Sequence, residues 1–157
     1  MKTRSSCSKE FAAWVLLRQA CDAICIARDA ELRNYGISTV EAGCLLIIKV
    51  KENMVTPAEI ARYLFRRPHS VSGLINRMER KGLVTKNKDL PRKNQIRMSI
   101  TEKGEKAYSQ STKRKSIARI FSTLNGEEIK QFTLYLKRLR AETLKEIKMD
   151  TAPPFPE

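Results

Sequence analysis

Apolar residues recur along this chain at the spacing of amphipathic helices, and capping or turn-forming residues separate the apolar segments. Between residues 9 and 34 the apolar positions follow a helical period, and Gly36 is a typical helix stop. Ser38 and Glu41 then form the S-x-x-E pattern of a capping box, in which each side chain accepts a hydrogen bond from the backbone of the other. This pattern predicts a long first helix and a second helix that runs to about Lys51.

A second capping box begins the next pair of helices. Thr56 and Glu59 form the box, and Pro57 suits the first position of a helix, where its missing N–H is not needed. This short helix is expected to end near residue 64 or 65, and a fourth helix is expected from His69 to Lys81 after a basic turn. The apolar stripe of the fourth helix consists of Val71, Leu74, Ile75 and Met78.

The segment after the fourth helix predicts a β-hairpin. Residues 83–86 are typical of a strand, and residues 95–100 alternate polar and apolar side chains as a half-buried strand does. The sequence KDLPRKN between them is polar and turn-forming. A lone hairpin is marginal in water, so this one is expected to pack on the helices.

Two further helices are expected after the hairpin. Thr101 caps a helix predicted over residues 102–122, and Asn125 with Glu128 caps a last helix that runs to about residue 149. A Pro-rich tail, TAPPFPE, follows. The predicted fold class is mainly α with a small two-stranded β wing, namely a winged helix-turn-helix with additional long helices.

Positive charge is concentrated in the middle of the chain. The whole chain has 31 Lys and Arg against 17 Asp and Glu, for a net charge of +14. Between residues 62 and 97 the net charge is +9, because only Glu79 and Asp89 oppose the basic residues. These are Arg62, Arg66, Arg67, Arg77, Arg80, Lys81, Lys86, Lys88, Arg92, Lys93 and Arg97. Nucleic acid is the simplest polyanionic partner, and a merely solvated charged face is the alternative.

The four cysteines do not predict a metal site. The chain has a single histidine and no CxxC pair, so we expect neither metal nor cofactor. Cys7, Cys21, Cys25 and Cys44 are interpreted as small apolar side chains, with thiol redox sensing at Cys21 and Cys25 as the alternative.

No segment approaches the roughly 20 apolar residues of a membrane helix. The basic start of the chain has no apolar run behind it, so a signal peptide is not expected. We therefore expect a cytoplasmic protein with no membrane partner.

The second helix of the pair has the side chains of a DNA-reading helix. Its non-core face is small and polar, which lets a helix approach the major groove, where Asn pairs with adenine, Arg with guanine and Ser with either. The predicted base-contacting residues are His69, Ser70, Ser72, Gly73, Asn76 and Arg77. Phosphate contacts are predicted for Thr56, Arg66 and Arg67 at the helix start and turn, and for Arg92, Lys93 and Arg97 on the wing.

The motifs together resemble the MarR family of bacterial regulators. The run TPAEIARYLFRRPHSVSGLINRMERKGLV, the hairpin after it and MSITEKG at a helix start carry the resemblance, over roughly residues 38–104. The most specific elements are KGLV at 81–84 and the spacing of Ile100, Thr101 and Gly104. The resemblance implies a homodimer that binds a pseudo-palindromic operator in double-stranded DNA, with the fourth helix in the major groove and the wing at the neighbouring minor groove.

The resemblance also implies a division of the chain and a means of regulation. Residues 1–36 would form an N-terminal dimerisation helix, 37–101 the DNA-binding domain, 102–149 the C-terminal dimerisation helices and 150–157 a flexible tail. Members of this family are often repressors that a small aromatic ligand or cysteine oxidation releases from DNA. Trp14 and Arg18 are the candidate ligand-pocket residues in this chain.

One part of the wing departs from the family pattern. The family often has Asp-x-Arg at the wing, with the Arg in the minor groove, but the corresponding residues here are Arg92 and Asn94. Asn94 can touch minor-groove edges, and Arg92, Lys93 or Arg97 can replace the family's arginine.

The predicted function is that of a transcription regulator that binds specific DNA sequences, and repression is the expected direction of regulation. A sequence-non-specific architectural DNA-binding protein and a cysteine-based redox regulator are the alternatives. An enzyme is not expected, because the chain has no Cys/His or Ser/His pairing pattern and no phosphate-cradling Gly loop.

Overall fold

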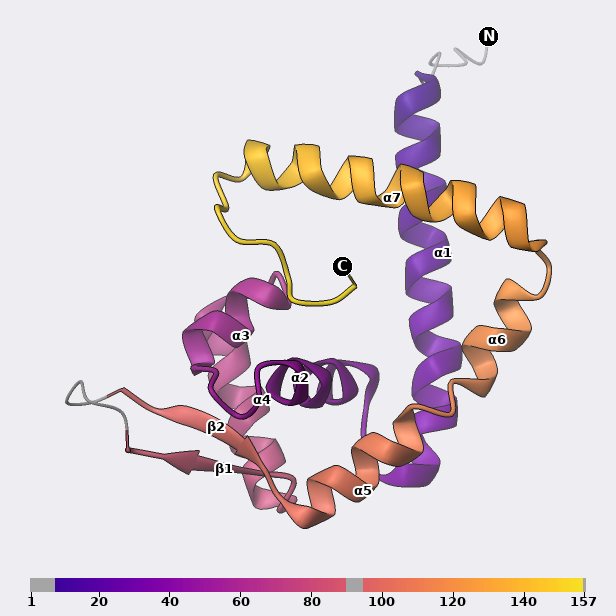
Figure 1. Cartoon of the computed structure of the whole chain (residues 1–157). Coiled ribbons are helices and arrows are strands. Elements are labelled where there is room, and N and C mark those ends of the chain that lie inside the picture. Colours follow the sequence, from indigo (N-terminus) through magenta and orange to yellow (C-terminus); the bar gives the residue numbers. More distant parts are fainter. Residues whose placement is uncertain (1–7, 90–94, 157) are drawn as a thin grey trace, which may run out of the picture.

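The computed structural model describes residues 8–89 and 95–156 and is mainly helical, with one two-stranded antiparallel sheet (Figure 1). This is the predicted fold class. The elements in chain order are α1 (Lys9–Leu32), a 3-10 turn η1 (Arg33–Tyr35), α2 (Thr39–Val50), α3 (Pro57–Tyr63), α4 (Pro68–Arg80), β1 (Val84–Asn87), β2 (Arg97–Ile100), α5 (Glu102–Ser111), α6 (Lys115–Phe121) and α7 (Gly126–Glu146).

Local capping fixes where most helices begin, as the sequence predicts. The predicted capping boxes form at the starts of α2, α3 and α7. In each, the side chain of the capping residue accepts a hydrogen bond from the backbone N–H three residues later, and the glutamate side chain there accepts one from the backbone N–H of the capping residue. The pairs are Ser38 with Glu41, Thr56 with Glu59, and Asn125 with Glu128. Gly36 and Gly82 both adopt φ of 71°, the left-handed conformation that glycine reaches without steric cost.

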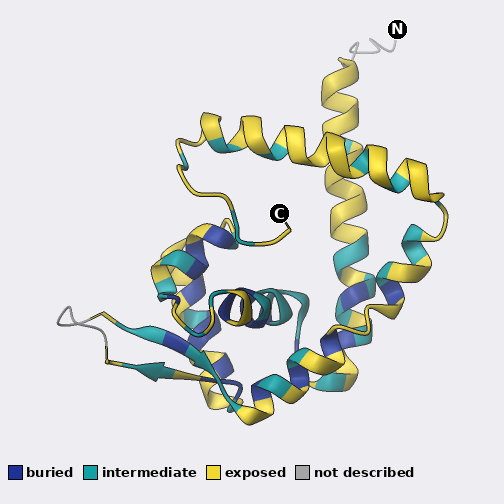
Figure 2. Ribbon diagram, in the orientation of Figure 1, coloured by how far each residue is buried: buried dark blue, intermediate teal, exposed yellow. Residues whose placement is uncertain are grey.

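The hydrophobic core lies where α2, α3, α4 and the hairpin meet. α2 contributes Cys44, Leu45 and Ile48, which are completely buried. All four residues of the predicted α4 stripe are buried, and Val84 and Met98 close the core from the two strands. The buried residues in Figure 2 accordingly gather in the lower half of the molecule.

The hairpin is joined to the helices by backbone bonds as well as by packing. Val84 pairs with Ile100 at its base, and Met98 N donates to Val55 O at 2.8 Å, so the segment before α3 adds a single bridge to the sheet. Asn53 Oδ1 accepts from Ile100 N at 2.9 Å. The wing is therefore anchored at its base to the α2–α3 connection.

The helix predicted over residues 102–122 is not continuous, which corrects that prediction. It is broken between Ser111 and Lys115, and Arg114 adopts a left-handed φ of 47°. The cause lies in α1: Glu31 accepts from the backbone N–H groups of Lys115 and Ser116, each at 2.9 Å. A carboxylate from a distant helix thus caps the N-terminus of α6.

A second carboxylate of α1 holds the start of α2 in the same way. Asp29 Oδ1 accepts from Thr39 N at 2.6 Å, and this backbone bond lowers the pKa of Asp29. Arg28 directly precedes Asp29 and is buried. Its guanidinium pairs with the Glu31 carboxylate at 2.8 Å and also donates to Ser111 O. One turn of α1 therefore positions two other helices.

The two long helices leave apolar side chains exposed. On α1 these include Phe11, Trp14, Leu16, Leu17 and Ile26, and on α7 Leu134, Tyr135, Leu136, Leu139. No residue of α7 is buried, and the N-terminal half of α1 is almost entirely exposed (Figure 2). No described helix is both long and apolar enough to cross a membrane.

Candidate nucleic-acid interface

The candidate interface is the outer face of α4 with the turn before it and the wing after it. The predicted base-contacting residues His69, Ser70, Ser72, Asn76 and Arg77 are all exposed, and Gly73 is half-buried. Because the opposite stripe is fixed in the core, α4 can present this face without rearrangement. The structure thus brings the predicted residues of α4 onto one surface.

The turn between α3 and α4 places two arginines beside the start of α4. Phe65 takes the left-handed position, at φ 52°, where a glycine is usual, and Arg66 N donates to Ala61 O at 2.9 Å. Arg66 and Arg67 are exposed. Thr56, in contrast, directs both its N–H and its hydroxyl to Glu59 Oε2 at 2.8 Å, so a phosphate at this position would compete with a carboxylate already there.

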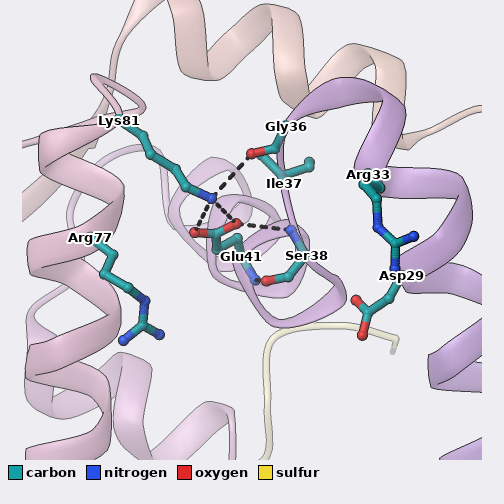
Figure 3. A pocket seen from close by; sticks show the side chains of 8 residues that line it. All are labelled: Asp29, Arg33, Gly36, Ile37, Ser38, Glu41, Arg77 and Lys81. Carbon is teal, nitrogen blue, oxygen red and sulfur yellow. Dashed lines mark hydrogen bonds and ion pairs between the residues drawn. The ribbon is translucent and has the colours of Figure 1, made fainter.

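Arg77 faces a polar cleft between α4 and the α1–α2 connection (Figure 3). The cleft has a volume of about 510 Å³, and Arg33, Glu41 and Lys81 are among its lining residues. No described residue accepts a hydrogen bond from the Arg77 guanidinium, which lies 3.7 Å from the point that a Cβ on Gly73 would occupy. The Arg77 guanidinium is therefore available to an external acceptor.

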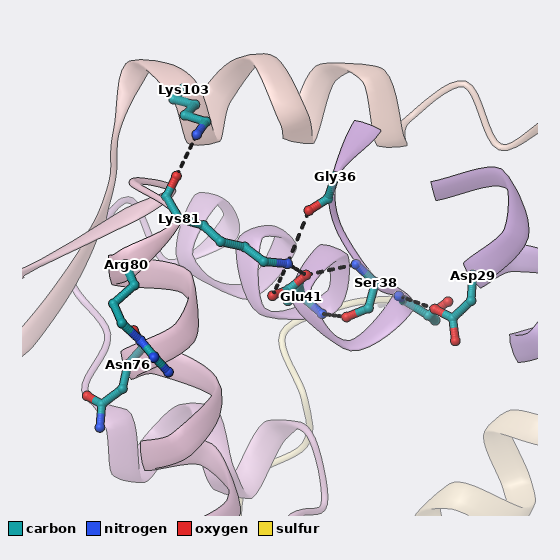
Figure 4. A network of polar contacts seen from close by, with 9 residues as sticks. Asp29, Gly36, Ser38, Glu41, Asn76, Arg80, Lys81 and Lys103 are labelled. Carbon is teal, nitrogen blue, oxygen red and sulfur yellow. Dashed lines mark hydrogen bonds and ion pairs between the residues drawn. The ribbon is translucent and has the colours of Figure 1, made fainter. Parts of the chain in front are cut away.

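An ion pair between a buried glutamate and an exposed lysine fixes the C-terminal end of α4. Lys81 Nζ donates to both carboxylate oxygens of Glu41, at 2.8 and 2.9 Å, and to Gly36 O at 3.1 Å (Figure 4). Glu41 is only 3% exposed and also caps α2 through Ser38 N, so its charge is paired and hydrogen-bonded as burial requires. Lys103 on α5 donates to Lys81 O at 2.7 Å. This network joins α4 to α2, η1 and α5.

A second lysine connects α4 to the wing, and the sequence reasoning assigned it no role. Lys86 Nζ on β1 donates to Asn76 Oδ1 at 2.7 Å and to Glu79 Oε2 at 2.8 Å. Its position in a basic run was visible in the sequence. Its partners were not, because they depend on how the hairpin packs against α4.

The wing contains a further internal ion pair. Arg97 pairs with Asp89 across the hairpin, and the Arg97 guanidinium also donates to Asn53 O at 3.1 Å and to Ser99 Oγ at 2.6 Å. The hydrogen bond that the Arg97 guanidinium donates to the Asp89 carboxylate lowers the pKa of Asp89. Arg97 is thus committed to intramolecular contacts that hold the hairpin. Arg92, Lys93 and Asn94, the other predicted wing contacts, lie outside the described residues.

The residues considered for ligand or redox chemistry lie away from this interface. Trp14 and Arg18 are on the exposed part of α1, where Arg18 lies 3.8 Å from Asp22, and neither lines the cleft of Figure 3. Cys21 is exposed and Cys25 half-buried. Burial, followed by the neighbouring Cys21, raises the pKa of Cys25, which disfavours the reactive thiolate.

Cys44 is completely buried in the core, and burial raises its pKa to about 12. Within the described residues no cluster of three or more His, Cys, Asp or Glu side chains forms a candidate metal site.

Comparison with solved structures finds close similarity over the full chain. The organohalide-sensing transcriptional regulator RdhR-CbdbA1625, bound to 2,4-dichlorophenol, is 27% identical, with a TM-score of 0.88 over 100% of this chain and 95% of that one. A DNA complex of Staphylococcus aureus MepR is 23% identical, with a TM-score of 0.73 over 87% and 99% of the two chains. A mutant of Escherichia coli MarR with operator DNA is 16% identical, with a TM-score of 0.76 over 83% and 95%. The latter two likenesses establish the fold alone.

Sequence comparison gives the same assignment for the central region. No curated protein matches the chain in sequence. The sequence profile of the MarR family matches residues 35–91, which include α2, the helix-turn-helix and β1. The predicted resemblance is confirmed: residues 35–91 match the MarR family, and the chain has the winged helix-turn-helix fold of the MarR-family transcription regulators it is similar to.

Proposed function

We propose that this protein is a sequence-specific DNA-binding transcription regulator that acts as a homodimer on a pseudo-palindromic operator, and that it is a repressor rather than an enzyme. The observation that carries the proposal is the exposed polar face of α4, which the core, the Glu41–Lys81 ion pair and the wing hold from three sides. The net charge of +9 over residues 62–97 supplies the attraction to phosphate. The DNA complexes of MepR and MarR, which share the fold, support the same role.

The test is fluorescence-anisotropy binding to the DNA upstream of the protein's own gene and to scrambled DNA of equal length, at two salt concentrations. We expect a preference for the upstream DNA that persists at the higher salt, because base contacts are less salt-dependent than phosphate contacts. Equal affinities that fall together as salt rises would instead favour architectural, sequence-independent binding and would contradict the proposal.

The apolar side chains that α1 and α7 leave exposed support the proposed homodimer. Trp14 is 55% exposed and Leu139 56%, and no described part of the chain covers the N-terminal half of α1. Exposed apolar surface of this extent is characteristic of an interaction site. A second copy of the chain, bringing the same two helices, would bury it in the symmetric manner of most soluble oligomers. On this view residues 1–36 and 102–149 are the dimerisation elements and 37–101 the DNA-binding domain.

Light scattering after size-exclusion chromatography would test the dimer. The unmodified chain should elute with twice the mass of one chain, and Trp14→Glu combined with Leu139→Glu should give a monomer that keeps its helical circular dichroism. Arg62→Glu, a charge change at an exposed position of α3 outside the proposed dimerisation elements, is the control and should leave the mass unchanged. A monomeric parent chain would contradict the proposed dimer.

For the effector, we propose a small aromatic molecule with a hydroxyl or carboxyl group, bound in the cavity between α1, α2 and α5. This cavity has a volume of about 170 Å³ and is lined by Arg28, Thr39, Leu46 and Tyr108, among others. Thr39 Oγ1 is buried in the wall of this cavity, beside the Asp29 carboxylate. The 2,4-dichlorophenol complex of RdhR-CbdbA1625 supports this chemical class.

The effector is tested with 2,4-dichlorophenol as the probe. Addition of this phenol should weaken operator binding by the unmodified chain, and Thr39→Val should remove the response while leaving the affinity for DNA intact. The same response in the variant would exclude this cavity as the effector site.

A peroxide treatment followed by a DNA-binding measurement tests the redox alternative at Cys21 and Cys25. Unchanged affinity for DNA after the treatment would exclude redox sensing by these cysteines.

A further inference from the structure

The fold sets the orientation of the Asn76 side-chain amide, because its oxygen is already engaged by a lysine. Its Oδ1 lies 2.7 Å from Lys86 Nζ, and the same ammonium lies 2.8 Å from Glu79 Oε2. A lysine ammonium has only donors, so it must face the amide oxygen and not the amide nitrogen. Lys86 is itself held by the packing of β1 on α4 and by Glu79, so the orientation of the amide is set by the fold.

This orientation has a consequence for base recognition. The usual pairing of Asn with adenine uses both ends of the amide: the nitrogen donates to N7 and the oxygen accepts from the N6 amino group. An amide oxygen has two lone pairs, but a donor on the second would bring the partial positive charge of an N6–H next to the Lys86 ammonium. Guanine has two acceptors, O6 and N7, on its major-groove edge and no donor there. An amide that offers only its two N–H groups matches guanine better than adenine.

We propose that Lys86 is a specificity-determining residue that acts through Asn76, so that α4 selects guanine and disfavours adenine at one base pair of its site. This inference rests on the proposed function, because it requires the outer face of α4 to lie in the major groove. Asn76 and Arg80 lie on the same side of α4, with Arg80 Nε 3.4 Å from Asn76 O (Figure 4). Asn76 is exposed on this face, whereas Lys86 is only 29% exposed and lies behind it. Lys86 is thus a positioning residue and Asn76 the residue that contacts the base.

The experiment is the selection of binding sites from a random-sequence DNA duplex library by the full-length protein and by four variants. Asn76→Ala identifies the base pair that depends on Asn76. Lys86→Met removes the ammonium but keeps much of the aliphatic side chain, and Lys86→Arg keeps a donor for Asn76 Oδ1. Lys88→Met, an exposed position two residues along the chain, is the matched control for the loss of one positive charge.

The unmodified protein should prefer guanine over adenine by about 5- to 150-fold at the Asn76-dependent base pair, the range for one bidentate contact. Lys86→Met should shift this one preference toward adenine and leave the other positions of the selected site unchanged. Lys86→Arg should restore guanine, and Lys88→Met should alter no base preference.

Three results would overturn the inference and leave the proposed function standing. Adenine at the Asn76-dependent position in the unmodified protein would exclude a donor-only amide. Loss of affinity for all sequences alike in Lys86→Met, with unchanged preferences, would assign Lys86 to a phosphate or to stability. No effect of Asn76→Ala would remove Asn76 from the groove. A library from which the unmodified protein enriches no sequence would overturn the proposed function itself and this inference with it, so the two failures are distinguishable.

Discussion

At the scale of single residues, Gly104 explains why the Ile100, Thr101 and Gly104 spacing is specific. Thr101 Oγ1 donates to Gly82 O at 2.6 Å and accepts from Gly104 N at 3.0 Å, which folds α5 tightly onto the end of α4. A Cβ on Gly104 would lie 2.1 Å from Leu83 O. A backbone atom cannot move aside as the end of a flexible side chain can, so only glycine fits.

Gly104→Ala is therefore expected to destabilise the protein by about 1–3 kcal/mol or more, the cost of forcing an extra carbon into a packed site. The measurement is urea unfolding followed by circular dichroism. The control is Gly126→Ala at the first position of α7, where no atom lies within 4 Å, and this variant should be neutral or stabilised by up to about 1 kcal/mol. Equal urea midpoints of unfolding for the two variants would contradict the conclusion that only glycine fits at position 104.

Arg77 carries the second residue-scale prediction. Its guanidinium has no acceptor among the described residues, so Arg77→Ala should lose a DNA contact without freeing an internal partner. If the contact is bidentate, the loss should be about 1–3 kcal/mol of binding free energy and should relax specificity at one base position. Competition binding with singly substituted operators measures both quantities. Unchanged affinity would remove Arg77 from the recognition face, and Lys106→Ala on α5 is the control.

At the scale of elements, α1 acts as a scaffold for the helices around it through Asp29 and Glu31. Burial alone would raise the pKa of Glu31, but the hydrogen bonds from Ser116, Lys115 and Arg28 outweigh it and lower the pKa to about 2. Because the folded pKa is below the ordinary value of 4.5, the carboxylate contributes stability fully above about pH 4.5. That contribution is lost as the pH falls toward 2.

Glu31→Gln should therefore be less stable than the unmodified protein at pH 7, and the difference should shrink between pH 4.5 and pH 2. Urea unfolding at pH 7, 4 and 3 measures it. Glu142→Gln, at an exposed ion pair on α7, is the control and should show little effect at any of these values. A difference that is as large at pH 3 as at pH 7 would mean that the Glu31 charge does not stabilise α6.

The same elements mark how far the sequence alone could predict this structure. Helix starts were predictable because a capping box such as Thr56 with Glu59 acts over three residues. The break near Arg114 was not, because the carboxylate that caps α6 comes from Glu31, 84 residues before Lys115. The polar run from Ser109 to Ser116 was a weak signal of the break, since it offers few apolar residues for a helix stripe.

The candidate site also has a part that the sequence could predict and a part that it could not. The exposed face of α4 followed from its apolar period, whereas the commitment of Arg97 to Asp89 and Asn53 depends on the hairpin and on a connection far away in sequence. Arg97 was predicted as a DNA contact because it is a basic residue on the hairpin that can replace the family's arginine. Whether Arg92, Lys93, Asn94 and Arg97 contact DNA stays a prediction.

At the scale of the whole molecule, concentrated positive charge should make DNA affinity strongly dependent on salt. Each phosphate contact that is lost should reduce the slope of log affinity against log salt by about 0.9. Arg66→Ala should therefore weaken binding to all DNA sequences by a similar factor and flatten this slope by about one unit. Anisotropy titrations at four salt concentrations measure the slope, and Lys145→Ala should leave it unchanged. A sequence-selective loss in Arg66→Ala would contradict a pure phosphate role.

The interruption between α5 and α6 also has a mechanical meaning. α5 is ten residues long, Arg114 follows its C-terminal end, and its N-terminal end is joined to the wing and to α4, so a rotation of α5 about Arg114 would move that joined end. At 1.5 Å per residue α5 is about 15 Å long, so a rotation of about 4° about Arg114 displaces its N-terminal end by about 1 Å. In the proposed dimer, the distance between the two copies of α4 must match the pitch of DNA. The two backbone hydrogen bonds from α6 to Glu31 would therefore help to set that distance.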